Sequence, residues 1–249
     1  MISDIQQIKK KRNEFKNATV GFVPTMGSLH PGHISLVERA REENEIVFVS
    51  IFINPTQFDS KEDLNHYPSV LDDDLAILEK FNIDFVFTPK YDDLYPDHFA
   101  YKVEESDFSK ELCGASRNGH FNGVLSVVMK LLNIVSPTKA YFGEKDRQQL
   151  LLIKGMVEAF FLEVEIVASP TIREIDGLAM SSRNLRLNLE ERKIANKFPA
   201  LLRSNKSDKE ISEELNKNGF RTDYIETING IRYGAVFLGN VRLIDNVKS

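Results

Sequence analysis

The sequence is poor in cysteine, and charge of neither sign dominates it. Its 249 residues include a single cysteine, Cys113, which excludes an internal disulfide framework and a cysteine-rich zinc site. A lone cysteine is more often a small buried hydrophobe than a nucleophile. Lys and Arg number 32 against 37 Asp and Glu, a net charge of −5, so a nucleic-acid partner is disfavoured. The basic run at residues 9–12 is explained more simply as the solvated face of a helix.

Long apolar runs are also missing. The longest, residues 46–53, is too short to span a bilayer, and the N-terminus lacks the apolar region of a signal peptide. A single cysteine also fits a reducing compartment. We therefore expect a cytoplasmic protein with no membrane partner.

What is present is the composition of a globular protein. Hydrophobic residues make up 42% of the chain and charged residues 28%, which excludes the disordered and fibrous classes. The length allows one large domain, or a larger domain followed by a smaller one.

The first two thirds of the chain alternate between short apolar runs and amphipathic stretches. Strands are predicted at residues 20–23, 46–53, 84–88, 139–142 and 163–168, and helices at residues 31–44, 70–81, 122–135 and 146–160. This alternation predicts an α/β fold, a Rossmann-like doubly wound parallel sheet with helices on both faces. Ligands of such sheets bind beyond the carboxyl ends of the strands.

The pattern changes near residue 169. Helical patterns are predicted at residues 189–203 and 207–218, and short strands at residues 224–228, 235–238 and 242–244. We expect residues 1–169 to form the Rossmann-like domain and residues 170–249 a second, smaller α+β domain.

The first predicted strand leads into Pro-Thr-Met-Gly-Ser-Leu-His-Pro-Gly-His at residues 24–33. A strand, a glycine turn and a helix start make an anion site, because the helix N-terminal amides lack partners. His30 and His33, three residues apart, could donate hydrogen bonds to triphosphate oxygens. The alternative is a helix cap with two surface histidines, but the position after a buried strand favours the anion site. No further ligand at a usual spacing supports zinc.

Polar residues also follow two other predicted strands. Gln57 follows the second strand, where its amide could accept from a hydroxyl and donate to a carboxylate; a solvated glutamine after a turn is an equally good interpretation. Residues 143–146 follow the strand at 139–142, where Lys145 suits a phosphate and Asp146 a helix cap or a ribose. The alternative for Lys145 is an ordinary surface charge.

A last polar cluster occupies residues 173–184. Ser181 and Ser182, followed by Arg183, form a donor-rich loop suited to a triphosphate. The alternative is an interdomain linker, and a hinge and a ligand loop are compatible roles.

These motifs resemble one family. Residues 24–33 resemble the His-x-Gly-His signature of the nucleotidylyltransferase superfamily. Residues 54–58, 118–124, 143–149, 180–184 and 242–246 are similar to the pantothenate synthetase (pantoate–β-alanine ligase) family. The similarity is collinear over nearly the whole chain.

The resemblance implies a reaction. ATP, (R)-pantoate and β-alanine would give pantothenate, AMP and pyrophosphate through a pantoyl adenylate, with Mg²⁺, in a homodimer. An acyl adenylate is labile in water, and we hypothesise that residues 170–249 protect it as a lid that closes through a hinge at residues 169–184.

The resemblance also implies site residues. The catalytic residues would be His33, Lys145 and Arg183. ATP would be bound by Met26, Gly27, Ser28, Leu29, His30, Pro31, Gly32, His33, Gly143, Glu144, Lys145, Asp146, Ile172, Met180, Ser181, Ser182 and Arg183. Pantoate and β-alanine would be held by Gln57, Gln149, Asn54 and His120. Asp73 and Asp74 match acidic positions near the metal.

Two alternatives stay open from the residues alone. Another nucleotidylyltransferase, such as a phosphopantetheine adenylyltransferase, would share the histidine motif but form no amide. A non-catalytic nucleotide-binding module would use the same residues only to hold its ligand. A class I aminoacyl-tRNA synthetase is disfavoured by the length and the net charge. AMP formation that needs both pantoate and β-alanine would single out the ligase.

Overall fold

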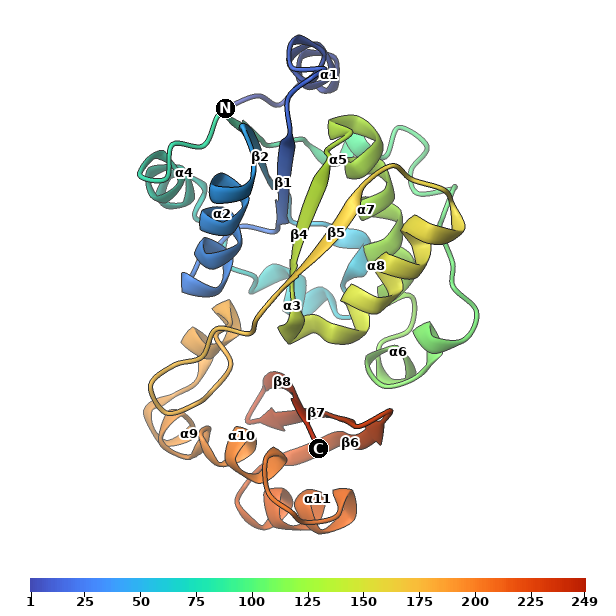
Figure 1. The fold of residues 1–249 in the computed structure, drawn as a ribbon. Helices are drawn as coiled ribbons and strands as arrows, with labels where there is room; N and C mark the ends of the chain where they lie inside the picture. The colour runs from blue at the N-terminus through green and yellow to red at the C-terminus, as the bar shows by residue number, and fades with distance from the viewer. The chain divides into compact units, whose positions relative to one another are not determined.

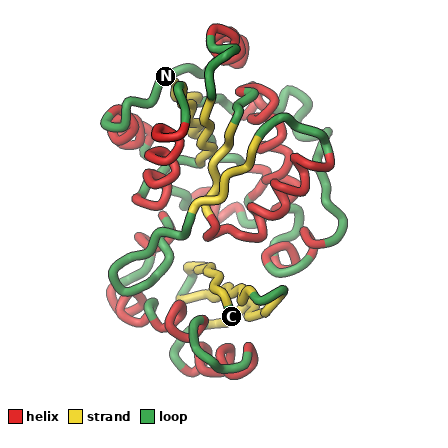
Figure 2. Tube along the Cα trace, in the orientation of Figure 1, coloured by secondary structure: helices red, strands yellow, loops and turns green.

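The computed structural model describes all residues from 1 to 249, and the chain divides into two compact units (Figures 1 and 2). The first unit comprises Met1–Leu29, His33–Gly143 and Gln148–Ser169. The second comprises His30–Gly32, Glu144–Arg147 and Pro170–Ser249.

The first unit is built on a parallel sheet of five strands. They are β1 (Val20–Thr25), β2 (Ile46–Ile51), β3 (Phe85–Phe87), β4 (Lys139–Gly143) and β5 (Glu165–Ser169), in the order β3-β2-β1-β4-β5. The predicted Rossmann-like sheet is confirmed. The strand order reverses between β1 and β4. In sheets of this kind, ligands bind at such a reversal, in the crevice beyond the carboxyl ends of the strands.

Helices flank this sheet. They are α1 (Ile5–Glu14), α2 (Pro31–Glu43), α3 (Lys61–Asn65), α4 (Leu71–Glu79), α5 (Tyr91–Leu94), α6 (Cys113–Ser116), α7 (His120–Val135) and α8 (Arg147–Ala159). Figure 1 shows α2 and α4 on one side of the sheet and α7 and α8 on the other. Val37 of α2 and Leu78 of α4 pack with Val49 of β2 in one buried cluster. None of the helices combines the length and apolar character that crossing a membrane requires.

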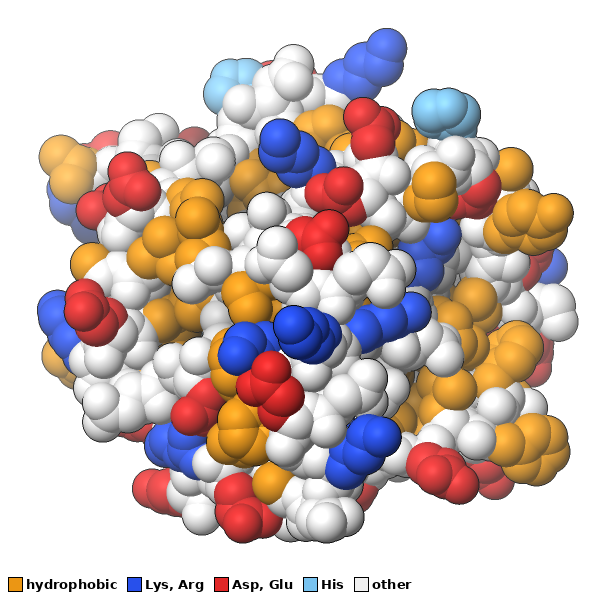
Figure 3. Space-filling model, turned by 90° about the horizontal axis from the view of Figure 1, so that it is seen from above, with side chains coloured by type: hydrophobic (Ala, Val, Ile, Leu, Met, Phe, Trp, Pro, Cys, Tyr) orange, Lys and Arg blue, Asp and Glu red, His pale blue; other side chains and the backbone are white.

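The basic run at residues 9–12 lies on α1. Lys9 and Lys10 are exposed, Lys11 pairs with Glu14 at 3.0 Å, and Arg12 donates to the carbonyl of Ser136 at 2.9 Å. Figure 3 looks onto the end of the molecule where α1 lies, and there basic and acidic side chains are interspersed. The run behaves as the solvated helix face that the sequence suggested.

The second unit is an α+β structure, as predicted. Its antiparallel sheet has the order β6-β7-β8, with β6 (Arg221–Ile228), β7 (Ile231–Leu238) and β8 (Val241–Lys248). Its helices are α9 (Leu189–Ile194), α10 (Lys197–Leu202) and α11 (Asp208–Lys217). The buried side chains of Phe198, Leu215 and Val236 share its core.

One predicted helix is wrong. The stretch at residues 189–203 forms two helices, α9 and α10, that break at Ala195 and Asn196. Pro199 lies in the first turn of α10, where its missing N–H costs nothing, but in the interior of one long helix it would remove a hydrogen bond and clash with the preceding turn.

Candidate active site

The loop after β1 is held by a carboxylate from α4. Asp74 accepts hydrogen bonds from the backbone N–H of Ser28 at 2.8 Å and of Leu29 at 2.7 Å, one on each oxygen. Gly27 and Ser28 both have left-handed backbones, with φ of 81° and 52°. The sequence predicted an anion site at the unpaired amides of the helix that begins at Pro31. The amides of Ser28 and Leu29 precede that helix, and a side chain of the protein occupies them.

A buried asparagine organises the turn after β2. Asn54 is 1% exposed and lies just before the short 3-10 helix η1 (Pro55–Gln57). Its amide nitrogen donates to Gln57 Oε1 at 3.0 Å, and its oxygen accepts from Tyr95 Oη at 3.0 Å. Burial raises the pKa of Tyr95 to about 12, so its hydroxyl remains a donor at neutral pH. Asn54 therefore orients Gln57.

Gln57 also reaches the loop after β1. Its Nε2 donates to the sulfur of Met26 at 3.2 Å. A residue predicted to bind ATP and one predicted to bind pantoate therefore touch, although 31 positions separate them in the sequence. Parallel strands bring their carboxyl ends to the same edge of a sheet, which explains the contact.

His120 holds the backbone of the same turn. Its Nδ1 lies 2.7 Å from the carbonyl oxygen of Gln57, and its Nε2 lies 3.0 Å from a guanidinium nitrogen of Arg117. A guanidinium can only donate, so Nε2 accepts and Nδ1 carries the proton that it donates to Gln57. Arg117 is fixed in turn by Asp59 at 3.0 Å. One ring nitrogen of His120 thus holds the backbone of Gln57, and the other holds Arg117.

A glycine lets α7 approach this turn. A Cβ atom at Gly123 would lie 2.3 Å from the carbonyl oxygen of Thr56 and 2.6 Å from the nitrogen of Gln57. No side chain fits there without displacing η1. The chemistry of the residues alone did not single out Gly123 as important. The family resemblance did include it, since Gly123 belongs to the motif at residues 118–124.

The structure distinguishes two neighbouring glutamines at the start of α8. Gln148 is buried, and its side chain bonds the backbones of Cys113, Phe108 and Glu111 at 2.8–3.1 Å. Gln149 is half-buried, and its amide forms no hydrogen bond within the protein. Of the two glutamines, Gln149 is therefore the one whose amide is not already used within the protein, and its role in holding pantoate stays a prediction.

In the second unit, strand β8 fixes the turn that carries Lys145. The side-chain amide of Asn246 donates to the carbonyls of Glu144 at 2.8 Å and Lys145 at 3.0 Å. The Lys145 ammonium lies 3.8 Å from Asp146 and is mostly covered. The sequence did not single out Asn246 as a site residue, although it belongs to the motif at residues 242–246.

His30 is held as a neutral imidazole. The backbone N–H of Gly32 donates to its Nδ1 at 3.1 Å, so the proton of the neutral ring is on Nε2, a donor. Burial, and then the charge of Lys145, lower the pKa of His30 to about 4, against the opposing charges of Asp146 and Glu174. His33 lies in the first turn of α2 and is half-buried.

This lowered pKa predicts a loss of stability in acid. Between pH 6.5 and pH 4 the unfolded chain binds a proton at His30 that the folded chain does not, so the free energy of unfolding should fall as pH falls through this range, by roughly 1–3 kcal/mol. The variant His30→Gln should lack this part of the loss, measured by urea unfolding at pH 7 and pH 4. His98→Gln, which changes an exposed histidine, should retain it. If the free energy of unfolding fell equally between pH 7 and pH 4 in wild type and in His30→Gln, the lowered pKa of His30 would be contradicted.

The loop at residues 172–184 is ordered by a backbone hydrogen bond within the loop and by an ion pair to β8. Met180 N–H donates to the carbonyl of Ile172 at 3.0 Å, and Arg173 pairs with both oxygens of Asp245 at 2.7 and 2.9 Å. Asp245 is 3% exposed, so this ion pair ties the loop firmly to β8. Arg173 and Asp245 therefore have structural partners.

The end of this loop carries the predicted triphosphate donors. The hydroxyl of Ser181 accepts from the backbone N–H of Arg183 at 3.2 Å and caps the 3-10 helix η4 (Ser182–Arg186). Ser182 is buried, and Asn184 donates to Glu174 at 2.7 Å. The cap fixes the backbone at Arg183 before any ligand binds.

The predicted metal position does not fit a cation. Asp73 is exposed on α4, and both oxygens of Asp74 accept from backbone amides. No group of three or more His, Cys, Asp or Glu side chains lies close enough together to hold a metal. Asp73 and Asp74 therefore do not form a magnesium site in this structure.

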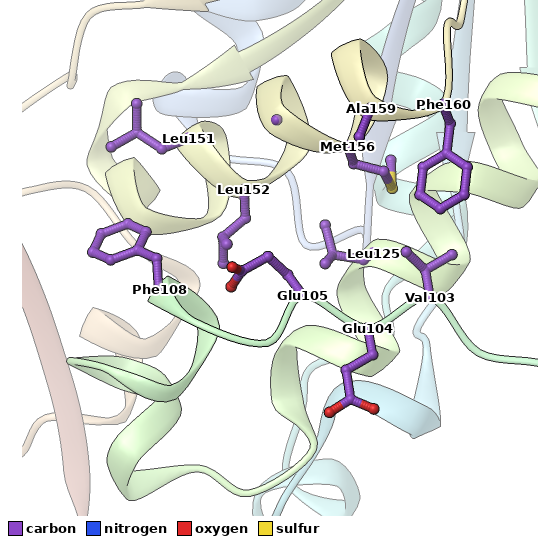
Figure 4. A pocket seen from close by; sticks show the side chains of 11 residues that line it. Val103, Glu104, Glu105, Phe108, Leu125, Leu151, Leu152, Met156, Ala159 and Phe160 are labelled. Atoms are coloured by element: carbon purple, nitrogen blue, oxygen red, sulfur yellow. The ribbon is translucent and has the colours of Figure 1, made fainter.

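One apolar hollow is lined by none of the predicted site residues. It has a volume of about 270 Å³ and is lined from α7, α8 and residues 103–108. Figure 4 shows Leu125, Leu152 and Met156 among its lining, with the carboxylates of Glu104 and Glu105 nearby. Apolar walls and carboxylates do not suit an anionic substrate, so we place no substrate there.

Comparison with known proteins decides the family. A family model described as pantoate-beta-alanine ligase matches residues 1–248. The chain belongs to the pantoate–β-alanine ligase family. A pantothenate synthetase from Bdellovibrio bacteriovorus is 54% identical over 99% of this chain and 96% of its own length. One from Legionella pneumophila is 50% identical over 92% of this chain and 90% of its own length.

Solved structures of the family share the fold. The pantoate-beta-alanine ligase from Francisella tularensis, complexed with beta-gamma ATP and beta-alanine, has a TM-score of 0.95 and 43% identity, and the match covers 99% of this chain and 96% of that one. The pantothenate synthetase from Thermus thermophilus has a TM-score of 0.89 and 39% identity, with 99% and 98% covered.

Proposed function

We infer that this chain condenses (R)-pantoate with β-alanine at the expense of ATP, and releases AMP and pyrophosphate through a pantoyl adenylate. The observation that carries this function is the family match over residues 1–248. Two pantothenate synthetases are also 54% and 50% identical in sequence to this chain. The family match favours the ligase over an adenylyltransferase or a non-catalytic nucleotide-binding module. The test is whether AMP formation requires pantoate and β-alanine together.

The first step joins two anions. A carboxylate oxygen of pantoate attacks the α-phosphorus of ATP, and the bond from that phosphorus to the bridging oxygen of pyrophosphate breaks. We propose that Lys145, Arg183 and His33 stabilise the charge on the phosphoryl group and on the leaving pyrophosphate. The neutral His30, with its proton on Nε2, supplies a further donor.

The second step forms the amide. The amine of β-alanine attacks the acyl carbon, the bond to AMP breaks, and the amine nitrogen loses a proton. No protein nucleophile is needed, because positioning alone can supply effective molarities of about 10⁵ M or more. We propose that Gln57 and Gln149 hold pantoate and that Gln57 also contacts β-alanine. Asn54 and His120 act by orienting Gln57, as their hydrogen bonds indicate.

We propose that ATP is bound by the residues that the resemblance implied. They are Met26, Gly27, Ser28, Leu29, His30, Pro31, Gly32, His33, Gly143, Glu144, Lys145, Asp146, Ile172, Met180, Ser181, Ser182 and Arg183. Because Asp74 already occupies the amides of Ser28 and Leu29, this loop contributes through its side chains and remaining backbone groups.

We propose that ATP enters as its magnesium complex. Mg²⁺ bound to nucleotides keeps several waters and is held largely by phosphate oxygens. No side chain of this chain is assigned as its ligand, since Asp73 and Asp74 do not fit.

The larger assembly is also a proposal. We propose a cytoplasmic homodimer in which residues 1–169 bind nucleotide and pantoate, and residues 170–249 close as a lid. Leu151 and Phe160, which line the hollow in Figure 4, are 40% and 56% exposed. Such exposed apolar side chains support an interface between two copies of the chain.

The dimer and the lid are tested separately. Sedimentation that gives a monomer would contradict the dimer. Small-angle scattering that is unchanged by ATP plus pantoate would contradict the lid.

The free amide of Gln149 predicts a substrate-specific defect. Gln149→Ala should raise the KM for pantoate by about tenfold, because it removes one or two hydrogen bonds to a charged or hydroxyl group. The dissociation constant for ATP, measured by calorimetry, should change little. An unchanged KM for pantoate would contradict the assignment. Gln6→Ala, at an exposed glutamine of α1, serves as the matched control.

A further inference from the structure

Both oxygens of the Asp74 carboxylate form hydrogen bonds within the protein. The side chain projects from the first turn of α4, and the residue is 1% exposed. Its oxygens accept from the amides of Ser28 and Leu29, which are 46 and 45 positions away in the sequence. A hydrated cation has no access to a carboxylate buried to this extent.

The loop that it holds needs an external restraint. Gly27 and Ser28 both have positive φ, which costs a residue with a side chain about 1–2 kcal/mol. The N–H of Gly27 donates to the Thr25 hydroxyl at 3.2 Å, and that hydroxyl donates to the carbonyl of Ser50 at 2.8 Å. Three successive amides, at residues 27, 28 and 29, therefore point at acceptors of the protein. The loop conformation is set before any nucleotide arrives.

We propose that Asp74 is a positioning residue of the ligase: its carboxylate clamps the Gly27–Leu29 turn in the conformation that presents Met26 and the first turn of α2 to ATP, and it does not bind magnesium. The proposal rests on the proposed function, because it assigns the clamp to the ATP site of that reaction. It replaces the metal role that the resemblance implied with one that the hydrogen bonds show. It also explains why α4 carries a buried acid opposite a glycine, since a Cβ at Gly27 would lie 2.8 Å from Asp74 Oδ2.

The test compares Asp74→Asn with Asp72→Asn. Both variants remove one negative charge from the first turn of α4, but Asp72 is exposed. In Asp74→Asn the amide group presents a donor to one of the two backbone N–H groups, so the turn should loosen. Hydrogen exchange at Ser28 and Leu29, followed by NMR on the full chain, should accelerate at least about tenfold. The ratio kcat/KM for ATP should fall by about 10²-fold, the effect of misplacing a positioned group by about 1 Å.

Varying the magnesium concentration separates the clamp from a metal role. The clamp predicts a defect of the same size at every magnesium concentration, and Asp72→Asn within about twofold of wild type in every measurement. Recovery of Asp74→Asn by added Mg²⁺, with the exchange rates of Ser28 and Leu29 unchanged, would overturn the proposal. Wild-type kinetics in Asp74→Asn would overturn it as well.

A second variant breaks the same contact from the loop side. Gly27→Ala, which displaces the carboxylate and cannot adopt the left-handed φ without strain, should reproduce the faster exchange at Leu29 and the loss in kcat/KM. Gly27→Ala tests the clamp even if Asp74→Asn fails to fold. Wild-type hydrogen exchange at Leu29 and a wild-type kcat/KM in Gly27→Ala would contradict the clamp. Failure of the proposed function would appear separately, as wild-type protein without pantoate-dependent turnover.

Discussion

Replacing Lys145 by methionine is expected to lower kcat by about 10²–10³-fold, while the dissociation constant for ATP changes by less than about tenfold. Methionine retains the length of the side chain and removes its charge. The charge on the phosphoryl group and the leaving pyrophosphate grows in the transition state, so a cation acts there more than on bound ATP. Steady-state kinetics and calorimetry with a non-hydrolysable ATP analogue measure the two quantities.

The same substitution has a second, independent readout. The charge of Lys145 is one cause of the lowered pKa of His30, so Lys145→Met should raise that pKa from its value of about 4, seen in an NMR titration of the imidazole. The control is Lys154→Met, which changes an exposed lysine of α8 and should leave both kcat and the titration unaltered. Near-normal turnover in Lys145→Met would refute the role given to this lysine, and an unmoved His30 pKa would refute their proximity.

The variant Gly123→Ala should disable pantoate binding and weaken the fold together. The added methyl group would lie 2.3 Å from the carbonyl oxygen of Thr56, so η1 must move away from α7. Overpacking of this kind costs about 1–3 kcal/mol of unfolding free energy. Because Gln57 ends η1, the KM for pantoate should also rise, by about tenfold or more. Urea unfolding and initial rates at varied pantoate concentration test the two effects.

A glycine elsewhere in the helices provides the control. Gly155 of α8 has no atom within 4 Å of the Cβ position, so Gly155→Ala should be neutral or stabilise the fold by up to about 1 kcal/mol. Similar stabilities of Gly123→Ala and wild type would show that the close approach of α7 to η1 is not needed.

The sequence predicted the fold because its elements are strongly periodic. The buried strands and amphipathic helices of the parallel sheet were predictable from local patterns, and the alternation of the two determined its topology. The division of residues 189–203 into α9 and α10 depended on one proline, Pro199, whose effect the helical pattern concealed.

For the candidate site, less could be predicted from the sequence than for the fold. Strand ends predicted that Met26, Gln57 and Lys145 lie near a ligand, and of these the structure brings Met26 and Gln57 into contact. The partners that hold them could not be read from the sequence, since Asn246 acts on a turn about 100 residues earlier in the chain, with separations of 102 and 101. Asp74 shows the same limit, because the family resemblance implied a position near the metal, and only the structure reveals that its carboxylate accepts from two backbone amides.

The measurement that tests the central claim most directly is pyrophosphate release by the purified protein with ATP and Mg²⁺, first with pantoate alone and then with β-alanine added. A single-turnover burst with pantoate, which becomes steady AMP formation only when β-alanine is present, is the predicted result. It would demonstrate the adenylate intermediate and the ligase together. Pyrophosphate release that does not depend on pantoate would contradict the substrate assignment.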